Sequence, residues 1–313
     1  MLEIKENIEL KPYTYFKIGG PARFFVEVKT ASELAEAVAF AKKEKCPFFV
    51  VGAASNILVA DRGFDGLFIR LLLRDLKKEG TNLIAGAGVP MAVLVARALQ
   101  EGLCGIEWAI GVPGTVGGSI RGNAGCFGGE VKDLLVSVKV FNTESGLVEK
   151  HDKAFCEFHY RESAFKKNPN LIVLEGEFAL REGDGEASRK IVRRYTSERS
   201  DHQDLGIPSA GCVFKNVPWP VDEVARAHLL RLVPHLAEFK DWPTISAGFL
   251  IDNLGLKGRA IGNVSVSKKH GNYFINNGGA TAEEVIMLIG LVKEYVHRKY
   301  DLHLDEEIQY VGF

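Results

Sequence analysis

Three short polar motifs contain the side chains that could carry out chemistry. In residues 160–163 (YRES), Arg161 follows a tyrosine and could hold a carboxylate or an oxyanion through paired hydrogen bonds. Small residues around Cys212 (SAGCVFKN) form a turn that would present a thiol, and Glu307 belongs to an acidic pair near the C-terminus. Taken alone, each motif has a plainer explanation: a surface ion pair, a small buried cysteine and a solvated acidic pair.

Residues 111–129 (GVPGTVGGSIRGNAGCFGG) could bind an anion through the backbone. Eight of these nineteen residues are glycine, and the segment has neither helical nor strand periodicity. Glycine allows close approach to a ligand, and successive N–H groups can form a nest for phosphate. The segment therefore predicts a cradle for the pyrophosphate of a dinucleotide, with a glycine-rich turn region in a β-structure as the alternative. It matches neither the P-loop nor the Rossmann pattern.

A second candidate phosphate loop, residues 52–56 (GAASN), follows an expected buried strand over residues 47–51. The junction between a strand and a small-residue loop is a common place for a phosphate. The alternative is a plain turn in which the serine and asparagine side chains bond to their own backbone. The loop alone does not distinguish the two.

Eight segments, taken in order, resemble the UDP-N-acetylenolpyruvoylglucosamine reductase family of flavoenzymes and cover nearly the whole chain. They are YTYFKIGGPA (13–22), VGAASNIL (51–58), GIEWAIGVPGTVGGSIRGNAGCFGGEV (105–131), YRESAFK (160–166), SAGCVFKN (209–216), SAGFLIDNLGLKG (246–258), KKHGNYFIN (268–276) and LDEEIQYVG (304–312). The long glycine block and the YRxSxFK motif are the most specific of these.

The resemblance implies an α+β fold in which a two-lobed FAD-binding module precedes a smaller α/β substrate-binding domain. The module, like that of vanillyl-alcohol-oxidase (PCMH-like) flavoenzymes, would span residues 1–200, with lobes of about 1–72 and 73–200. The substrate-binding domain would span 201–300, and residues 301–313 would return to the flavin as a C-terminal strand. We expect the flavin to lie extended between the lobes.

The resemblance also implies the reaction and its residues. NADPH would reduce FAD, and N5 of the reduced flavin would give hydride to the enolpyruvyl ether of UDP-N-acetylglucosamine, which yields UDP-N-acetylmuramate for peptidoglycan. Arg161 and Glu307 match the family's catalytic arginine and glutamate, which would stabilise the enolate-like charge. Glu307 then needs a raised pKa, because a neutral carboxyl does not oppose that charge. Cys212 would supply the proton.

The binding residues that the resemblance implies fall into two sets. Those expected to contact FAD are Gly52, Ser55, Asn56, Gly111, Gly114, Thr115, Gly117, Gly118, Ser119, Gly122, Asn123, Ala124 and Gly125. Those expected to contact the UDP-sugar are Tyr160, Lys215, Asn216, Arg199 and His270.

The sequence departs from the family pattern at several places. Cys212 stands where a serine is usual, and because a thiol is more acidic than a hydroxyl we expect a pH profile that is sensitive to thiolate formation. Ala53 and Ala54 replace commoner glycines, so we expect that loop to wrap FAD less closely. Gln309 stands where arginine is common, and no role is predicted for it. The short segment between Arg161 and Cys212 indicates the class without an inserted tyrosine-bearing loop. A proton from water instead of Cys212 stays an alternative.

Composition excludes several other classes of protein. The chain has 313 residues, 46% of them hydrophobic, and a formal net charge of −1, which predicts two or three domains and argues against a nucleic-acid partner. We find no signal peptide or membrane-spanning run. Five dispersed cysteines without a CxxC motif predict no disulfide framework or metal site and indicate a reducing, cytoplasmic setting. We expect a monomer with small-molecule partners.

Local patterns predict the elements that must position these residues. We expect strands over 24–28, 83–88 and 171–180, a hairpin of 136–142 with 147–150, and a final strand over 303–310. Helices are expected after the capping box Thr30–Glu33, between Pro90 and Gly102, over 186–200, within 245–258 and after Thr281. The last helix should bury Val285, Leu288, Val292 and Val296 on one face. A domain boundary is expected near 200–208.

Two other functions are consistent with the glycine segments. One is an FAD-dependent alcohol or sugar oxidase of the same superfamily, which would react rapidly with oxygen when reduced. The other is a non-catalytic nucleotide-binding protein, which would be colourless or would bind a coloured cofactor without turnover. The joint presence of the YRxSxFK and SAGCVFKN motifs argues against the oxidase.

Overall fold

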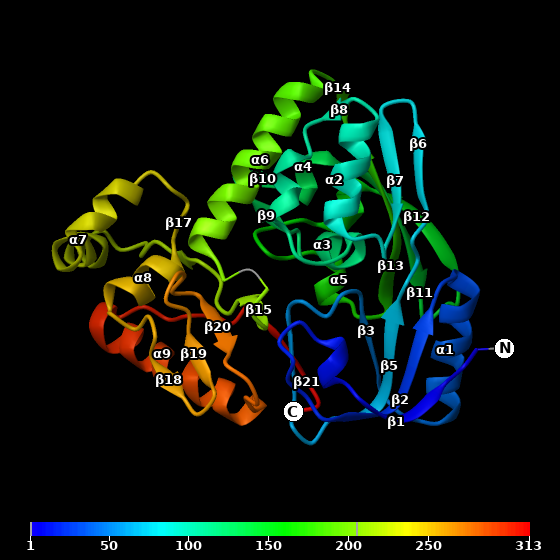
Figure 1. Cartoon of the computed structure of the whole chain (residues 1–313), viewed down its shortest axis with the longest axis horizontal. Helices are drawn as coiled ribbons and strands as arrows, with labels where there is room; N and C mark the ends of the chain where they lie inside the picture. The colour runs from blue at the N-terminus through cyan, green and yellow to red at the C-terminus, as the bar shows by residue number, and fades with distance from the viewer. Residues whose placement is uncertain (1, 205) are drawn as a thin grey trace.

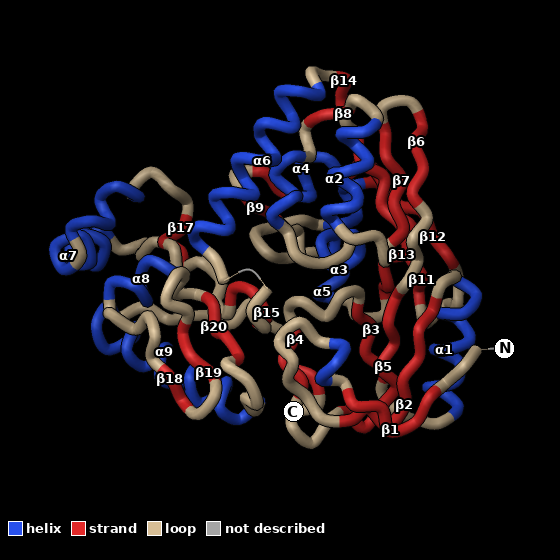
Figure 2. The backbone as a smooth tube through the Cα atoms, viewed as in Figure 1, coloured by secondary structure: helices blue, strands red, loops and turns tan. Residues whose placement is uncertain are grey.

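The N-terminal part of the chain folds into a four-stranded sheet covered on one side by a helix (Figures 1 and 2). The computed structural model describes residues 2–204 and 206–313. The strand order is β1 (Lys5–Glu9), β2 (Pro21–Val28), β5 (Phe64–Leu71) and β3 (Phe48–Val51), with β2, β5 and β3 parallel. Helix α1 (Ala31–Lys43) connects β2 to β3. The predicted strand at 24–28 and the helix after Thr30 are confirmed.

The start of α1 differs from the predicted capping box in one bond. The side chain of Thr30 accepts from the N–H of Glu33, as expected, at 3.1 Å. The carboxylate of Glu33, however, accepts from the N–H of Lys29 and not from that of Thr30. The residue before the cap therefore supplies the second donor.

The next part of the chain forms a five-stranded antiparallel sheet. Its order is β12 (Val148–Asp152), β11 (Leu135–Asn142), β13 (Leu171–Ala179), β7 (Asn82–Gly86) and β6 (Leu76–Glu79). Strands β11 and β12 are the predicted hairpin. Helices α2 (Met91–Gln100) and α6 (Gly185–His202) lie beside this sheet in Figure 1. One hydrophobic core, running in sequence from Phe24 to Leu180, joins this sheet to the first.

The glycine-rich segment contains a short helix, α3 (Val116–Arg121), where we expected a loop. Its two apolar residues, Val116 and Ile120, are four positions apart and both fully buried. The N–H groups of Val116 and Gly117 donate to the carbonyls of Val89 and Ala87, which fixes the start of the helix. Two apolar positions among many glycines are too few for a detectable helical period, which explains the error.

The C-terminal part has its own sheet of β15 (Ser209–Cys212), β20 (Tyr273–Asn276), β19 (Val264–Val266) and β18 (Ala260–Ile261). It packs with α7 (Glu223–Leu232), α8 (Ala247–Asn253) and α9 (Ala282–Tyr300), which Figure 1 shows in yellow to red. Thr281 and Glu284 form a complete capping box at the start of α9. Val285, Leu288, Val292 and Val296 of this helix are fully buried, as predicted.

Residues from both ends of the chain cross between these parts. Phe16 and Ile18, near the N-terminus, pack in the core of the C-terminal part. Strand β21 (Gln309–Val311) returns to pair in parallel with β4 (Ile57–Val59). The predicted final strand is too long, because residues before Gln309 make only an isolated bridge between Glu306 and Phe214. The division at residues 200 and 201 stays a prediction; α6 ends at His202.

The remaining elements are short. They are β8 (Leu103–Cys104), β9 (Gly125–Cys126), β10 (Gly129–Glu130), β14 (Arg181–Glu182), β16 (Val217–Pro218), β17 (Thr244–Ile245), α4 (Val131–Leu134), α5 (Ala164–Lys167) and the 3-10 helices Lys11–Tyr13, Glu107–Gly111, Lys153–Cys156 and Pro234–Phe239. No helix of the described residues has the length and apolarity needed to cross a membrane.

Candidate active site

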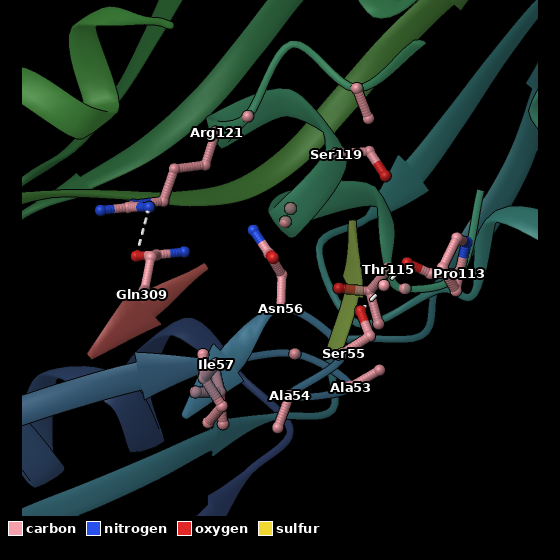
Figure 3. Close-up of a pocket in the computed structure, with 18 of the residues that line it drawn as sticks. Ala53, Ala54, Ser55, Asn56, Ile57, Pro113, Thr115, Ser119, Arg121 and Gln309 are labelled. Atoms are coloured by element: carbon pink, nitrogen blue, oxygen red, sulfur yellow. Dashed lines mark hydrogen bonds between the residues drawn. The ribbon is translucent and has the colours of Figure 1, made fainter. Parts of the chain in front are cut away.

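A cavity of about 670 Å³ lies where the three parts of the chain meet. This volume is within the range of about 300–1,000 Å³ that is typical of ligand pockets. Its wall includes residues 52–57, much of 111–126 and, from distant segments, Arg161, Cys212 and Glu307. Figure 3 shows part of this wall, with the loop of Ser55 and Asn56 facing Thr115 and Ser119. Two regions that the sequence separates therefore share one pocket.

The phosphate loops pack against each other so closely that only glycine fits at several positions. We call residues 52–56 and 111–119 the glycine cradle. A Cβ at Gly52 would lie 2.1 Å from Oγ1 of Thr115, and a Cβ at Gly117 would lie 2.7 Å from Cβ of Ala87. Both distances are shorter than side chains tolerate. Gly52 therefore lets the two loops pack against each other, whereas Gly117 lets the second loop pack against Ala87.

Oγ1 of Thr115 is buried and has no hydrogen-bond partner among the described residues. A buried polar atom without a partner costs free energy, so native structures seldom leave one unless a ligand or water completes it. Oγ1 lies beside Gly52 in the wall of the cavity. The cradle therefore has the donor chemistry and the close main-chain approach that a pyrophosphate requires.

The loop of Ala53 and Ala54 reaches this conformation without glycine. Ala54 has a φ of +54°, in the left-handed region that favours glycine. Its methyl group is buried in a small core with Val51 and Ile57, which offsets part of the conformational cost. How closely the loop wraps a bound cofactor stays a prediction.

Residues 160 and 161 form the tip of a two-residue hairpin that presents their side chains. His159 and Glu162 exchange two backbone hydrogen bonds of 3.1 and 3.2 Å. Arg161 consequently adopts a φ of +56°, an unfavourable value for an arginine that the surrounding contacts must hold. The next residues of the motif supply these contacts: Oγ of the fully buried Ser163 donates to the carbonyl of Arg121, and Nζ of Lys166 donates to that of Arg161.

The hairpin brings Arg161 to Glu307 at the edge of the cavity. Nε of Arg161 donates to Oε1 of Glu307 at 2.9 Å, and Nη2 donates to the carbonyl of Gly125 at 3.2 Å. Cys212, at the end of β15, lies in the same wall. We call Arg161, Cys212 and Glu307 the polar cluster. Its members come from segments as far as 146 residues apart, so the fold assembles it.

The electrostatics of the polar cluster favour neutral acids. Burial raises the pKa of Glu307, although Arg161 and Lys166 lower it in part. Burial also raises the pKa of the Cys212 thiol to about 12, with Glu307 adding to the effect. Burial therefore moves thiolate formation to a higher pH than that of an ordinary thiol, and the expected sensitivity of the pH profile to it stays a prediction.

Comparisons with known proteins identify the family. Residues 201–311 match the family model of the C-terminal domain of UDP-N-acetylenolpyruvoylglucosamine reductase, and residues 22–151 match that of an FAD binding domain. The UDP-N-acetylenolpyruvoylglucosamine reductase of Carboxydothermus hydrogenoformans is 37% identical over 99% of this chain and 94% of its own length. That of Caldicellulosiruptor bescii is 35% identical over 99% and 91%. The crystal structure of the Thermus caldophilus reductase matches with a TM-score of 0.77 at 31% identity, over 99% of this chain and 100% of that one.

The chain belongs to the UDP-N-acetylenolpyruvoylglucosamine reductase family. This confirms the predicted fold class, a two-lobed FAD-binding module followed by a smaller α/β domain. It also confirms an oxidoreductase that uses FAD, with NADPH as the reductant. The glycine cradle, with the unpartnered Oγ1 of Thr115, fits the FAD that the family requires.

The structure places almost all of the residues predicted to contact FAD in the wall of this cavity, and the contacts themselves stay a prediction. Those in its wall are Gly52, Ser55, Asn56, Gly111, Gly114, Thr115, Gly117, Gly118, Ser119, Gly122, Ala124 and Gly125. Asn123 is the exception: it is fully buried outside the wall. Its Nδ2 donates to Glu130 and to the carbonyl of His159, and its Oδ1 accepts from the N–H of Lys132. Asn123 thus joins the glycine-rich segment, beyond α3, to the hairpin that carries Arg161.

Only some of the residues predicted to contact the UDP-sugar lie near one another, and none of them lies in the wall of the cavity. The hydroxyl of Tyr160 accepts from the N–H of Asn216 at 3.2 Å, and Nζ of Lys215 forms an ion pair of 2.7 Å with Glu162. Arg199 donates to Gln203 at the opposite end of the polar cluster. His270 packs beneath α8, where burial lowers its pKa.

Sequence reasoning gave no role to six polar residues of the wall, namely Arg121, Lys166, Asn170, Gln203, Tyr273 and Gln309. Lys166 belongs to the YRxSxFK motif, so the motif itself was a signal for it. Arg121 had one indirect signal. Its partner Gln309, which accepts from Nη1 of Arg121 at 2.7 Å, replaces an arginine that is common at that position.

Proposed function

We propose that the protein reduces the enolpyruvyl ether of UDP-N-acetylglucosamine to UDP-N-acetylmuramate. The observation that carries this proposal is the ion pair of Arg161 and Glu307, which lies with Cys212 in the wall of the cavity that also contains the glycine cradle. A cation, a carboxyl group with a raised pKa and a protonated thiol are the groups that reduction of an enol ether next to a carboxylate requires.

The cradle would hold FAD through residues 52–56 and 111–119. Bound FAD supplies a hydride, taken from NADPH, to the terminal vinyl carbon of the substrate. The remaining wall, near Cys212 and Tyr273, is left for the substrate or NADPH. We propose that NADPH and the substrate bind at this part of the wall one after the other.

Arg161 orients the substrate carboxylate and stabilises the negative charge that spreads onto it during reduction. Its guanidinium is held by Glu307 and by the carbonyl of Gly125, so it does not reorganise as the charge develops. Glu307 shares its proton or stays neutral, because burial raises its pKa. A charged Glu307 would oppose the same charge.

Cys212 delivers the proton to the carbon that bears the ether oxygen, and its thiolate then recovers a proton from solvent. A thiol that stays protonated through the neutral range is ready to donate. Lys215, Asn216 and Tyr160 are proposed to contact the nucleotide at the rim of this site, with Arg199 on the facing side. His270 is proposed only as a support beneath α8, since it lies outside the wall.

The cellular compartment and the partners of the protein are part of the proposal. We propose a cytoplasmic monomer whose partners are NADPH and the UDP-sugar. The five cysteines, all within the described residues, carry free thiols, which fits a reducing compartment.

The visible spectrum of the purified protein tests the function. NADPH added without oxygen should bleach the flavin, and the enolpyruvyl substrate should then restore the colour while UDP-N-acetylglucosamine, which lacks the enolpyruvyl group, should not. Rapid recovery of colour by oxygen alone would instead identify an oxidase. A colourless protein that binds no FAD would refute the proposal altogether.

A further inference from the structure

Arg121 is a partly buried cation of the cavity wall to which the proposed reaction gives no role. It lies at the C-terminal end of α3, the helix whose first residues belong to the glycine cradle. Its guanidinium has five N–H donors, but within the described residues only one hydrogen bond from it is formed, from Nη1 to Oε1 of Gln309 at 2.7 Å. No carboxylate of the described residues forms an ion pair with it, whereas Arg161 and Lys215 each have one.

The contacts of Arg121 place it at the catalytic end of the cavity. Its carbonyl accepts from Ser163 of the YRxSxFK motif, and Gln309 follows Glu307 by two residues. In Figure 3, Arg121 and Gln309 lie on one side of Asn56, with Ser55 and Thr115 on the other. A cofactor whose pyrophosphate occupied the cradle near Ser55 and Thr115, and which extended along the wall past Asn56, would bring its ring and not its phosphates toward Arg121.

The charges around Arg121 leave a surplus of positive charge. Arg121, Arg161, Lys166 and Lys215 surround the two carboxylates Glu162 and Glu307. Burial lowers the pKa of both Arg121 and Lys166, because the charged form of each is less well solvated here than in water. An anion in the cavity would offset that loss of solvation.

We propose that Arg121, held by Gln309, is a positioning residue that stabilises the negative charge of the reduced flavin ring. Reduction by NADPH transfers a hydride to FAD, releases NADP⁺ and leaves the ring with one more negative charge. A fixed cation near the ring nitrogens stabilises that form over the oxidised one and so raises the reduction potential.

The inference rests on the proposed function only in that the protein must bind FAD. The test is therefore made without the UDP-sugar substrate. The reduction potential of bound FAD is measured by equilibration with a reference dye in the wild type, Arg121→Gln and Arg121→Lys. Arg121→Gln should weaken binding of reduced FAD relative to oxidised FAD about tenfold, a fall of roughly 30 mV for a two-electron couple. Arg121→Lys should retain most of the potential.

The control is Arg97→Gln, which removes a partly exposed arginine of α2 that forms an ion pair with Glu101 and should leave the potential unchanged. Where Arg121→Gln purifies without FAD, the dissociation constants of oxidised and reduced FAD give the same ratio. Equal weakening of both forms would overturn the proposal and assign Arg121 to the pyrophosphate. An unchanged potential with a raised KM for the UDP-sugar would overturn it in favour of substrate binding. Neither result affects the colour test of the reductase activity.

Discussion

The two regions of the cavity wall are built in opposite ways. The glycine cradle consists of main chain from two loops, and its fit depends on side chains that are absent, at Gly52 and Gly117. The polar cluster consists of side chains from three distant segments, held by an ion pair and by a strained turn at Arg161. The cradle should therefore be sensitive to added atoms and the cluster to changed functional groups.

The largest expected effect is on the cluster. Cys212→Ala should slow reoxidation of the reduced flavin by the enolpyruvyl substrate about 10²- to 10⁴-fold, because it removes a general acid. Reduction by NADPH and the amount of bound FAD should stay near those of the wild type. Stopped-flow absorbance of the two half-reactions separates these effects. Cys212→Ser, which keeps a hydroxyl donor, is the matched control and should recover much of the rate; equal rates in all three proteins would show that water donates the proton.

The next largest effect is expected at Asn123, which connects the glycine-rich segment to the hairpin of Arg161. Asn123→Ala removes hydrogen bonds to Glu130, His159 and Lys132 in a fully buried place, and it puts alanine at a φ of +41°. The free energy of unfolding should fall by about 2–4 kcal/mol, as measured by urea denaturation of the FAD-free protein. A variant with unchanged stability and weakened FAD binding would restore the predicted cofactor contact.

The cradle itself is tested by adding one carbon at neighbouring glycines. Gly117→Ala would place a Cβ 2.7 Å from Cβ of Ala87 and should lower the free energy of unfolding by about 1–3 kcal/mol. Gly118→Ala is the matched variant, since its Cβ meets nothing closer than Oγ1 of Thr115 at 3.8 Å. It should leave the FAD-free protein as stable as the wild type and weaken FAD binding, measured by fluorescence titration. Equal stability of both variants would show that the start of α3 can move away from Ala87.

Sequence patterns predicted which residues belong to each region, but not the contacts with distant segments that hold those residues in place. Local patterns were sufficient for α1, the β11–β12 hairpin and α9, because their caps, turns and buried faces lie within one segment. They failed for α3, whose start is fixed by carbonyls of residues 87 and 89. The packing of Phe16 in the C-terminal core and the bond of Arg121 to Gln309 join residues more than 180 positions apart, so no local pattern indicates them.

The smallest expected effect, a pH dependence, should appear in one region only. Because burial raises the pKa of Glu307 and the neutral carboxyl is the proposed active form, the rate of reoxidation by substrate should be constant below that raised pKa. It should fall about tenfold per pH unit above it, since the neutral fraction does so. The side chain of Glu307→Gln is neutral at every pH, so this variant should react more slowly than the wild type and its rate should not change with pH.

The Cys212 thiol should add no second decline of the rate below pH 9 or so, because burial raises its pKa to about 12. FAD affinity, which depends on main-chain donors, should not follow the Glu307 profile; if it does, the carboxyl group acts on the cofactor and the two regions are not independent.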